Sequence, residues 1–249
     1  MAAVGGEDGW DAGAERRPRP EGEGGGDGRY AAVLVLALAG LTALAWSTLA
    51  GPLPRPFAGL ASAPTADPTE ADALADRREA ALQFANDDPE SGDAAIVVPV
   101  IAAHLTDEDP VVRTAGATSV ARIGMADTPA AGSLRTAVMS NEALVESLLG
   151  ALVRIDSAAF DEDIVARSQA AAAIGWLWMR EPSPTVEQVL VGAYQAEVHR
   201  EVRSAIVDAL CLGRYASPGT EAVLRDAMAD YDANLAAEAA ACHAERFSP

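Results

Sequence analysis

The 249-residue chain contains no lysine, so all 18 of its basic side chains are arginines. Against them stand 37 acidic residues, which give the chain a formal net charge of −19. So acidic a chain lacks the clustered basic side chains that bind phosphates, which argues against a nucleic-acid partner. This composition is typical of proteins from salt-loving organisms, because concentrated salt screens the self-repulsion. A GC-rich genome, which favours Ala, Gly, Pro and Arg, is the alternative explanation.

Side chains that bind metals or carry out covalent catalysis are scarce. The two cysteines and three histidines do not fall in metal-binding spacings such as CxxC or HExxH. No nucleotide-binding glycine loop and no G-x-S-x-G motif occurs. The acidic triplets at 107–109 and 161–163 fall at expected helix starts, where carboxylates cap helices and stabilise the helix dipole. We therefore predict no catalytic residue, no cofactor and no metal.

Aromatic residues make up only 5% of the chain, whereas alanine accounts for 56 of its residues. Alanine has the highest helix propensity of all residues, and small side chains allow helices to pack closely. Few segments show the alternation of β-branched and polar residues that is typical of strands. The composition predicts an all-α fold.

Residues 30–53 form the one long run without a charged side chain. As a helix these 24 residues would extend about 36 Å, enough to cross a hydrocarbon core of about 30 Å. Tyr30 and Trp46 lie towards its two ends, where interfacial aromatics are common. The run predicts an uncleaved transmembrane helix. A cleaved signal peptide is the alternative, but the preceding 29 residues and the length of the run argue against it.

The segments that flank this run differ in composition. Residues 1–29, rich in Gly, Pro, Glu and Arg, predict a disordered acidic tail, and residues 54–68 a linker rich in Pro and Ala. Four arginines precede the run, whereas only Arg55 follows it within 20 residues. The positive-inside rule therefore predicts a single-pass cell-membrane protein with its N-terminus in the cytoplasm and residues 54–249 outside.

Helical patterns fill residues 69–249, most clearly in DEDPVVRTAGATSVARIG at 107–124. Asp109 is expected to cap a helix that begins with Pro110, where the missing N–H costs nothing. Val112 and Ala115 start an apolar face with helical spacing. Gly124 is expected to end this helix as a C-terminal cap.

This segment resembles the second helix of a HEAT or PBS-lyase HEAT-like repeat. A second strong copy lies at 197–213, and looser copies lie at 161–178 and 231–247. The residues that carry the resemblance are Asp109, Pro110, Val112, Arg113, Ala115, Ile123, Gly124, Val202, Arg203, Ala205 and Gly213. The resemblance implies an α-solenoid of about four helical hairpins over residues 69–249.

The remaining parts of the repeat pattern follow from spacing. First helices are expected near 93–105, 141–153, 184–195 and 219–229, and one more helix at 69–85. Arginines 113, 167 and 203 are separated by 54 and then 36 residues, whereas HEAT-like units span about 35–45. The wider gap predicts an insertion, either at 125–135 or at 155–160.

The resemblance also implies a structural role for Arg113 and Arg203. In this family such an arginine commonly bonds an acidic residue at the start of the same or an adjacent helix, and Asp109, Asp163 and Glu201 are the candidates here. Cys211 and Cys242 fall in consecutive second helices. Because stacked helices often lie too far apart for a bridge, we expect two buried free thiols, with a disulfide as the alternative.

HEAT-like arrays mostly hold protein partners, so we predict a membrane-tethered interaction module or scaffold without catalysis. Trp176 and Trp178 are the candidate partner contacts; at this spacing one is expected in the core and the other partly exposed. The partner is expected to be a membrane-associated protein. A bilin-lyase-like enzyme or enzyme accessory, and a passive structural subunit of an envelope complex, are the alternatives.

Overall fold

The computed structural model describes residues 68–247, apart from Pro89 and Ser91. These residues form ten helices and no strand, which confirms the all-α prediction. The predicted tail, membrane span and all but the last residue of the linker lie outside the described residues. Within the described part, no single helix is long and apolar enough to cross a membrane; α5 (Pro129–Ser140) and α6 (Glu142–Val153) reach that length and hydropathy only together, with a bend of 81°.

Nine of the ten helices lie where the repeat pattern places them. The helix expected at 69–85 is α2 (Pro68–Asn86). The first helices of the pairs are α3 (Ala94–Thr106), α6, α8 (Pro184–Ala196) and α10 (Pro218–Met228). The second helices are α4 (Pro110–Met125), α7 (Phe160–Trp178), α9 (Arg200–Leu212) and α11 (Ala233–Phe247).

The tenth helix, α5, is the insertion. It lies between α4 and α6, and its extra residues explain the wider spacing between Arg113 and Arg167. Only Ala131, Leu134 and Val138 are buried in it, at spacings of three and four that define one narrow apolar face. Ala137 and Met139 are partly buried against the core, and most of the other residues of α5 are polar or exposed.

Local sequence signals explain most helix starts. The Asp109 side chain accepts hydrogen bonds from the N–H groups of Val111 and Val112, and Pro110 is the first helical residue, as predicted. Asp93, Thr128, Asn141 and Ser217 cap their helices in the same way. The prediction that Gly124 ends α4 is wrong, because α4 continues to Met125 and is capped by Ala126.

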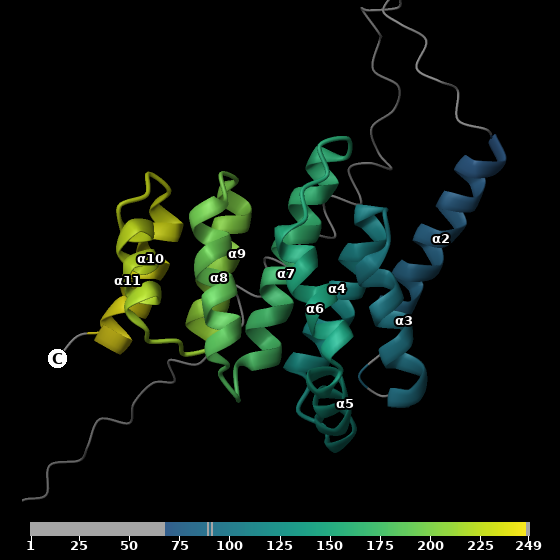
Figure 1. Cartoon of the computed structure of the whole chain (residues 1–249), viewed down its shortest axis with the longest axis horizontal. Helices are drawn as coiled ribbons and strands as arrows, with labels where there is room; N and C mark the ends of the chain where they lie inside the picture. The colour runs from purple at the N-terminus through teal and green to yellow at the C-terminus, as the bar shows by residue number, and fades with distance from the viewer. Residues whose placement is uncertain (1–67, 89, 91, 248–249) are drawn as a thin grey trace, which may run out of the picture. The chain divides into compact units, whose positions relative to one another are not determined.

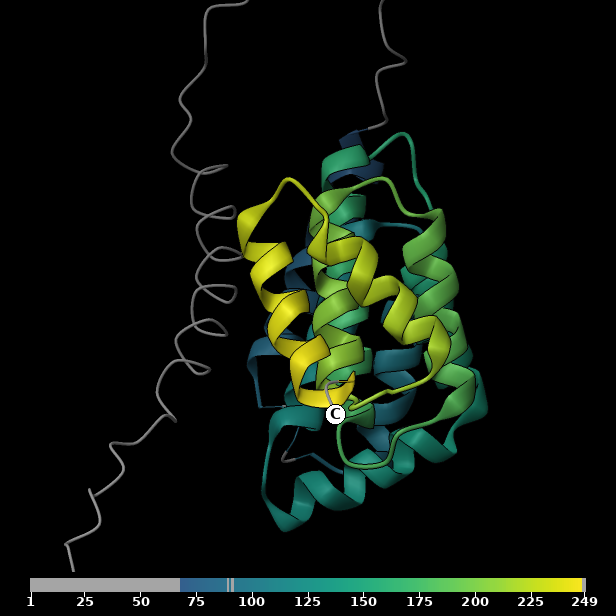
Figure 2. The same cartoon turned by 90° about the vertical axis from the view of Figure 1, so that its left-hand side faces the viewer.

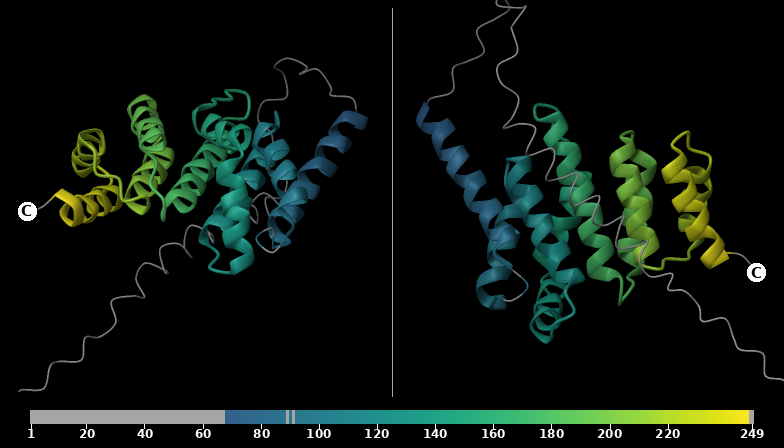
Figure 3. Two further views of the ribbon diagram at one scale, coloured as in Figure 1. Left: turned by 60° about the horizontal axis from the view of Figure 1, so that its bottom comes forward. Right: turned by 180° about the vertical axis from the view of Figure 1, so that it is seen from behind.

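The second helices lie side by side in one row, with α2 as its first member (Figure 3). They run parallel: Arg113 near the start of α4 contacts Asp163 near the start of α7, and Gly124 near the end of α4 contacts Trp176 near the end of α7. Figure 2 looks along the row from the α11 end, with one helical pair behind another. The first helices α3, α6, α8 and α10 pack beside this row.

Two glycines set the close spacing within the row. A Cβ added to Gly124 would lie 2.8 Å from the carbonyl carbon of Trp176, and one added to Gly175 would lie 2.7 Å from the Cα of Ala209. Because the obstructing atoms are backbone, only glycine permits this approach of α4 to α7 and of α7 to α9. The role of Gly124 is therefore helix packing rather than capping.

The core follows the row without interruption. A single cluster of buried side chains extends from Val97 on α3 to Cys242 on α11. A smaller cluster of Ala81, Ala85, Val112 and Ala115 attaches α2 to α4. Each helical pair thus buries its apolar face against the next pair and has no separate core.

Candidate functional site

Two fully buried charges, Arg113 and Asp163, join α4 to α7. Each residue is 1% exposed, and Arg113 Nη2 donates a 3.1 Å hydrogen bond to Asp163 Oδ1. Arg113 Nη1 donates to the backbone oxygens of Asp107 and Glu108, at 3.1 and 2.6 Å. Burial, followed by the charge of Arg154, lowers the pKa of Arg113, whereas Asp163 opposes that change. The pair is held by hydrogen bonds that satisfy most of its polar atoms.

Comparable bonds join every neighbouring pair of second helices. In each case an arginine of one second helix reaches an acidic group at the start of the next second helix or in the segment just before it. These bonds run from Arg78 to Asp109, from Arg113 to Asp163, from Arg167 to Glu197 and from Arg203 to Asp230. Arg167 also bonds Asp163 within α7, and Arg203 also bonds Asp226 on α10. We call this row of bonds the arginine ladder.

The ladder confirms part of what the repeat resemblance implied. Asp163 is the partner of Arg113, as expected, and Asp109 receives Arg78. All three acidic residues of the 161–163 triplet lie in the first turn of α7, as expected, but none of them caps it: α7 has no side-chain cap, and Asp163 bonds Arg113 and Arg167 instead. Glu201 pairs with Arg200 and does not contact Arg203.

Arg203 lies in a cluster that the sequence did not reveal. Its guanidinium lies 4.4 Å from the ring centre of Tyr194 and donates to the hydroxyl of that residue. Tyr194 in turn donates to Asp226 at 3.0 Å. Burial, then the carboxylate of Asp226, raises the pKa of Tyr194 to about 12, so the phenol stays a neutral donor at pH 7. These groups line a hollow of about 400 Å³, but their charges are already paired with one another.

A second hollow of about 360 Å³ lies between α5 and the end of α7. Arg135 and Arg180 line it, but Arg135 donates to the backbone oxygen of Ala126 at 2.7 Å and Arg180 bonds Asp127 at 2.8 Å. Within the described residues, no cluster of His, Cys, Asp and Glu side chains could hold a metal ion. Neither hollow pairs a nucleophile with a base, as covalent catalysis requires.

The two predicted contact tryptophans lie in different environments. Trp178 is 5% exposed and belongs to the core, whereas Trp176 is half-buried, which confirms the expected division. Trp176 lies on a stripe of α7 whose members recur every three or four residues: Val165, Gln169, Ala172 and Trp176. The equivalent stripe of α4 contains Val111, Thr114, Thr118 and Arg122. We call these partly exposed stripes the second-helix face.

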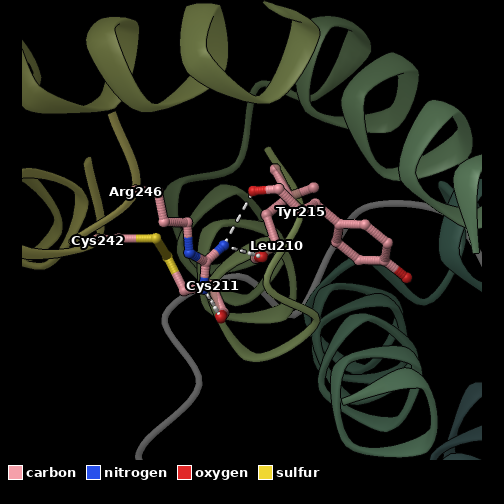
Figure 4. Close-up of a disulfide and its surroundings, with 5 residues drawn as sticks. All are labelled: Leu210, Cys211, Tyr215, Cys242 and Arg246. Atoms are coloured by element: carbon pink, nitrogen blue, oxygen red, sulfur yellow. Dashed lines mark hydrogen bonds between the residues drawn. A yellow bond between two sulfur atoms is a disulfide. The ribbon is translucent and has the colours of Figure 1, made fainter. Parts of the chain in front are cut away.

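Cys211 on α9 and Cys242 on α11 form a disulfide, with their Cα atoms 5.9 Å apart (Figure 4). The expectation of two free thiols is therefore wrong. That distance is well within the range that a disulfide bridges. Ala239, one turn before Cys242, is a small buried side chain on the same helix.

Arg246 reinforces the disulfide at the end of α11. Its guanidinium donates to the backbone oxygens of Leu210, Cys211 and Tyr215, which lie at and beyond the end of α9 (Figure 4). The oxygens of Leu210 and Cys211 also accept hydrogen bonds from the N–H groups of Tyr215 and Arg214 just past the helix, so the arginine adds to this C-terminal cap from a neighbouring helix. Cys242 and Arg246 are one turn apart, and together they attach α11 to α9.

A carboxyl pair, Asp208 and Glu238, weakens the contact between α9 and α11. Burial, followed by the hydrogen bond and charge of Glu238 on α11, raises the pKa of Asp208 on α9 to about 9. The Oδ1 atom of Asp208 is buried without a hydrogen-bond partner. The folded chain therefore favours the protonated Asp208, and ionising it destabilises the contact between α9 and α11.

Replacing Asp208 by asparagine is expected to stabilise the fold at neutral pH and to leave it unchanged near pH 3. The pKa of Asp208 is higher in the folded chain than in the unfolded one. Its contribution is therefore most favourable below the unfolded value and is lost as pH rises towards about 9. One such proton changes the free energy of unfolding by at most about 1.4 kcal/mol per pH unit. Urea titrations of both chains at several pH values measure the difference, and a constant difference would contradict this explanation.

No family model matches the chain, and no curated protein matches it. A solved structure titled "Crystal Structure of Engineered Protein" is similar, with 18% sequence identity and a TM-score of 0.48 over 74% of this chain and 79% of that one. A likeness at this level assigns neither a family nor a function.

Proposed function

We propose that this protein is a membrane-tethered scaffold of the HEAT-like solenoid type, which holds a protein partner and carries out no catalysis. The observation that carries the proposal is the arginine ladder. Its bonds run from each second helix to the start of the next one or to the segment just before it, and the central pair of Arg113 and Asp163 is fully buried. A row of helices fixed in this way presents a surface of constant shape, and such pre-organisation lowers the cost of binding.

The second-helix face is the surface we assign to the partner. It crosses α4 and α7, and neither of the two hollows described above lies on it, which suits the extended surface of a protein better than a small molecule. Trp176 is its largest apolar side chain, with part of the indole exposed and the rest packed against the core. Tryptophans held in this manner often dominate the binding energy of an interface.

The predicted span at 30–53 supplies the membrane attachment, with residues 54–249 outside the cell. The Cys211–Cys242 disulfide supports this orientation, because disulfides persist in oxidising compartments and are rare in the cytosol. We propose that the partner is a protein of the same membrane or its outer surface. A scaffold attached to one membrane would hold that partner at a fixed distance from the lipid.

The test is partner capture by the full chain in its native membrane. A photo-crosslinking residue at Ala172 lies one turn from Trp176 on the second-helix face, and it is expected to trap one protein partner. Trp176→Ala is expected to weaken capture by about tenfold, equivalent to about 1.4 kcal/mol.

Two controls make this test specific. Ile96→Ala removes an apolar side chain that is 66% exposed on α3, away from the second-helix face, and should leave capture unchanged. Trp176→Phe keeps an aromatic ring in the partly buried position and controls for loss of packing. Equal capture by Trp176→Ala and Ile96→Ala would overturn the assignment of this face.

A further inference from the structure

Exposed apolar side chains gather at one edge of the helical row. This edge consists of the connections from each first helix to its second helix, at residues 107–109, 154–159, 197–199 and 229–232. We call it the connection edge. Six of the nine large apolar side chains that the described residues expose lie in these connections or at the adjoining helix end. They are Val153, Ile155, Phe160, Val198, Met228 and Tyr231.

The exposure of these side chains is too great for a core role. Ile155 is 74% exposed, Val198 81% and Tyr231 87%. The connections are also joined to one another: the ring of Phe160 packs edge-on against His199 at 4.8 Å, and Arg200 bonds Asp232 at 3.2 Å. The apolar tips therefore project from a fixed frame, as loops that enter a bilayer interface do.

The chain enters the helical row at this same edge. Arg78 of α2 bonds Asp109 at the start of α4, and the two helices run parallel. Ten residues of α2 precede Arg78, so about 15 Å of helix extends beyond the start of α4. Figure 1 shows the beginning of α2 and the connections before α7, α9 and α11 on one side of the row.

The anchor predicted at 30–53 is separated from Pro68 by the 14 residues 54–67. Fully extended, these residues span at most about 50 Å, and proline favours a semi-extended spacer rather than a compact one. The membrane is therefore within reach of the connection edge. The opposite edge, which carries α5, faces away from the point where the chain enters (Figure 1).

The negative charge of the connection edge disfavours contact with anionic lipids. Exposed carboxylates surround the apolar tips, whereas basic groups there are few and Arg200 is already paired. The exposed acidic residues are Glu108, Asp161, Glu162 and Glu201. An anionic membrane would repel such an edge, whereas zwitterionic headgroups would not.

We propose that the connection edge lies on the membrane surface and inserts its apolar tips among zwitterionic lipid headgroups. This inference rests on the proposed tether and adds a second contact with the same bilayer. Ile155, Val198 and Tyr231 are the tips that enter the interface. The row of second helices then stands upright on the membrane, with the end of α7 and Trp176 directed away from it.

The experiment uses the full chain in nanodiscs of phosphatidylcholine, with one spin label at a time. Both native cysteines are joined to each other, so Val198→Cys supplies a single reactive thiol. The label at position 198 is expected to collide several-fold more with oxygen, relative to a water-soluble nickel complex, than a label at Ile96→Cys. Ile96 is similarly exposed but lies outside the connection edge. Equal ratios at both positions would overturn the proposal.

Two further experiments test the acidic rim and the apolar tips of the connection edge separately. Adding phosphatidylglycerol should lower the oxygen preference at position 198, and an increase instead would contradict the role of the acidic rim. Ile155→Asp with Tyr231→Asp should abolish the preference while leaving the unfolding midpoint unchanged, since both side chains are largely exposed.

Retention of the chain in nanodiscs after an alkaline wash tests the anchor alone. Retention with a water-exposed label refutes the edge contact, whereas loss of the chain refutes the tether.

Discussion

Replacing Arg113 by alanine is expected to lower the free energy of unfolding by about 3–5 kcal/mol, the usual cost of removing one partner of a buried ion pair. The substitution leaves Asp163 with only Arg167, and it removes the donor for the backbone oxygen of Glu108 and one of two donors for that of Asp107. Typical domains are stable by only about 5–15 kcal/mol, so the loss is a large fraction of the total. Urea titration followed by helical circular dichroism measures it.

Arg225→Ala is the matched control for that prediction. Arg225 also pairs with a carboxylate, Glu221, but 66% of its side chain is exposed and the pair lies within one helix. Such pairs contribute about 0.3–0.5 kcal/mol. If the two variants lost similar stability, the buried ladder would not be what stabilises the row.

Removing the disulfide with Cys211→Ser and Cys242→Ser is expected to cost about 3–4 kcal/mol. The bridge closes a loop with a sequence separation of 31, and the chain-entropy estimate for such a loop has this size. The loss should be local, because α11 is the last helix of the described row and its docking buries the carboxyl group of Asp208 beside Glu238, which costs free energy at neutral pH. Hydrogen exchange measures this directly, and the amides of α11 should lose protection before those of α7.

A reducing agent provides the control for the second prediction. It should destabilise the native chain and have no effect on the doubly substituted one, which lacks the thiols. Uniform loss of protection over all helices would contradict the local docking role. An unchanged exchange pattern would mean that Arg246 and the core around Ala239 hold α11 without the disulfide.

The sequence predicted those features that depend on neighbours in the chain. Asp109 with Pro110 marked a helix start, and the spacing of Val112 and Ala115 marked its buried face, because capping and periodicity are local. Helix α5 was missed as a helix, since only three of its residues are buried. It begins inside the first of the two predicted insertion sites, 125–135, and continues beyond it to Ser140.

Features that depend on distance between layers could not be predicted in the same way. The disulfide requires a Cα separation of 5.9 Å, which is set by the packing of α9 on α11 and not by either helix alone. Arg203 gains its partners Tyr194 and Asp226 from two first helices, so no spacing around Arg203 indicates them. The sequence alone does not tell whether Gly124 caps α4 or allows another helix to approach it. The backbone of Trp176, which lies against Gly124, shows that the role is packing.

The bonds of the arginine ladder all run in one direction along the row, from α2 towards α11. Helices α4 and α9 carry Arg113 and Arg203 as their fourth residue, whereas the fourth residue of α11 is Ala236. The last second helix thus receives bonds from α9 but has no guanidinium at this position to extend to a further layer. If a second copy of the chain packed against α11, the acidic groups of that copy would have no arginine at this position to bond. At this position α11 therefore offers a neighbouring layer no arginine, whereas α4 and α9 do.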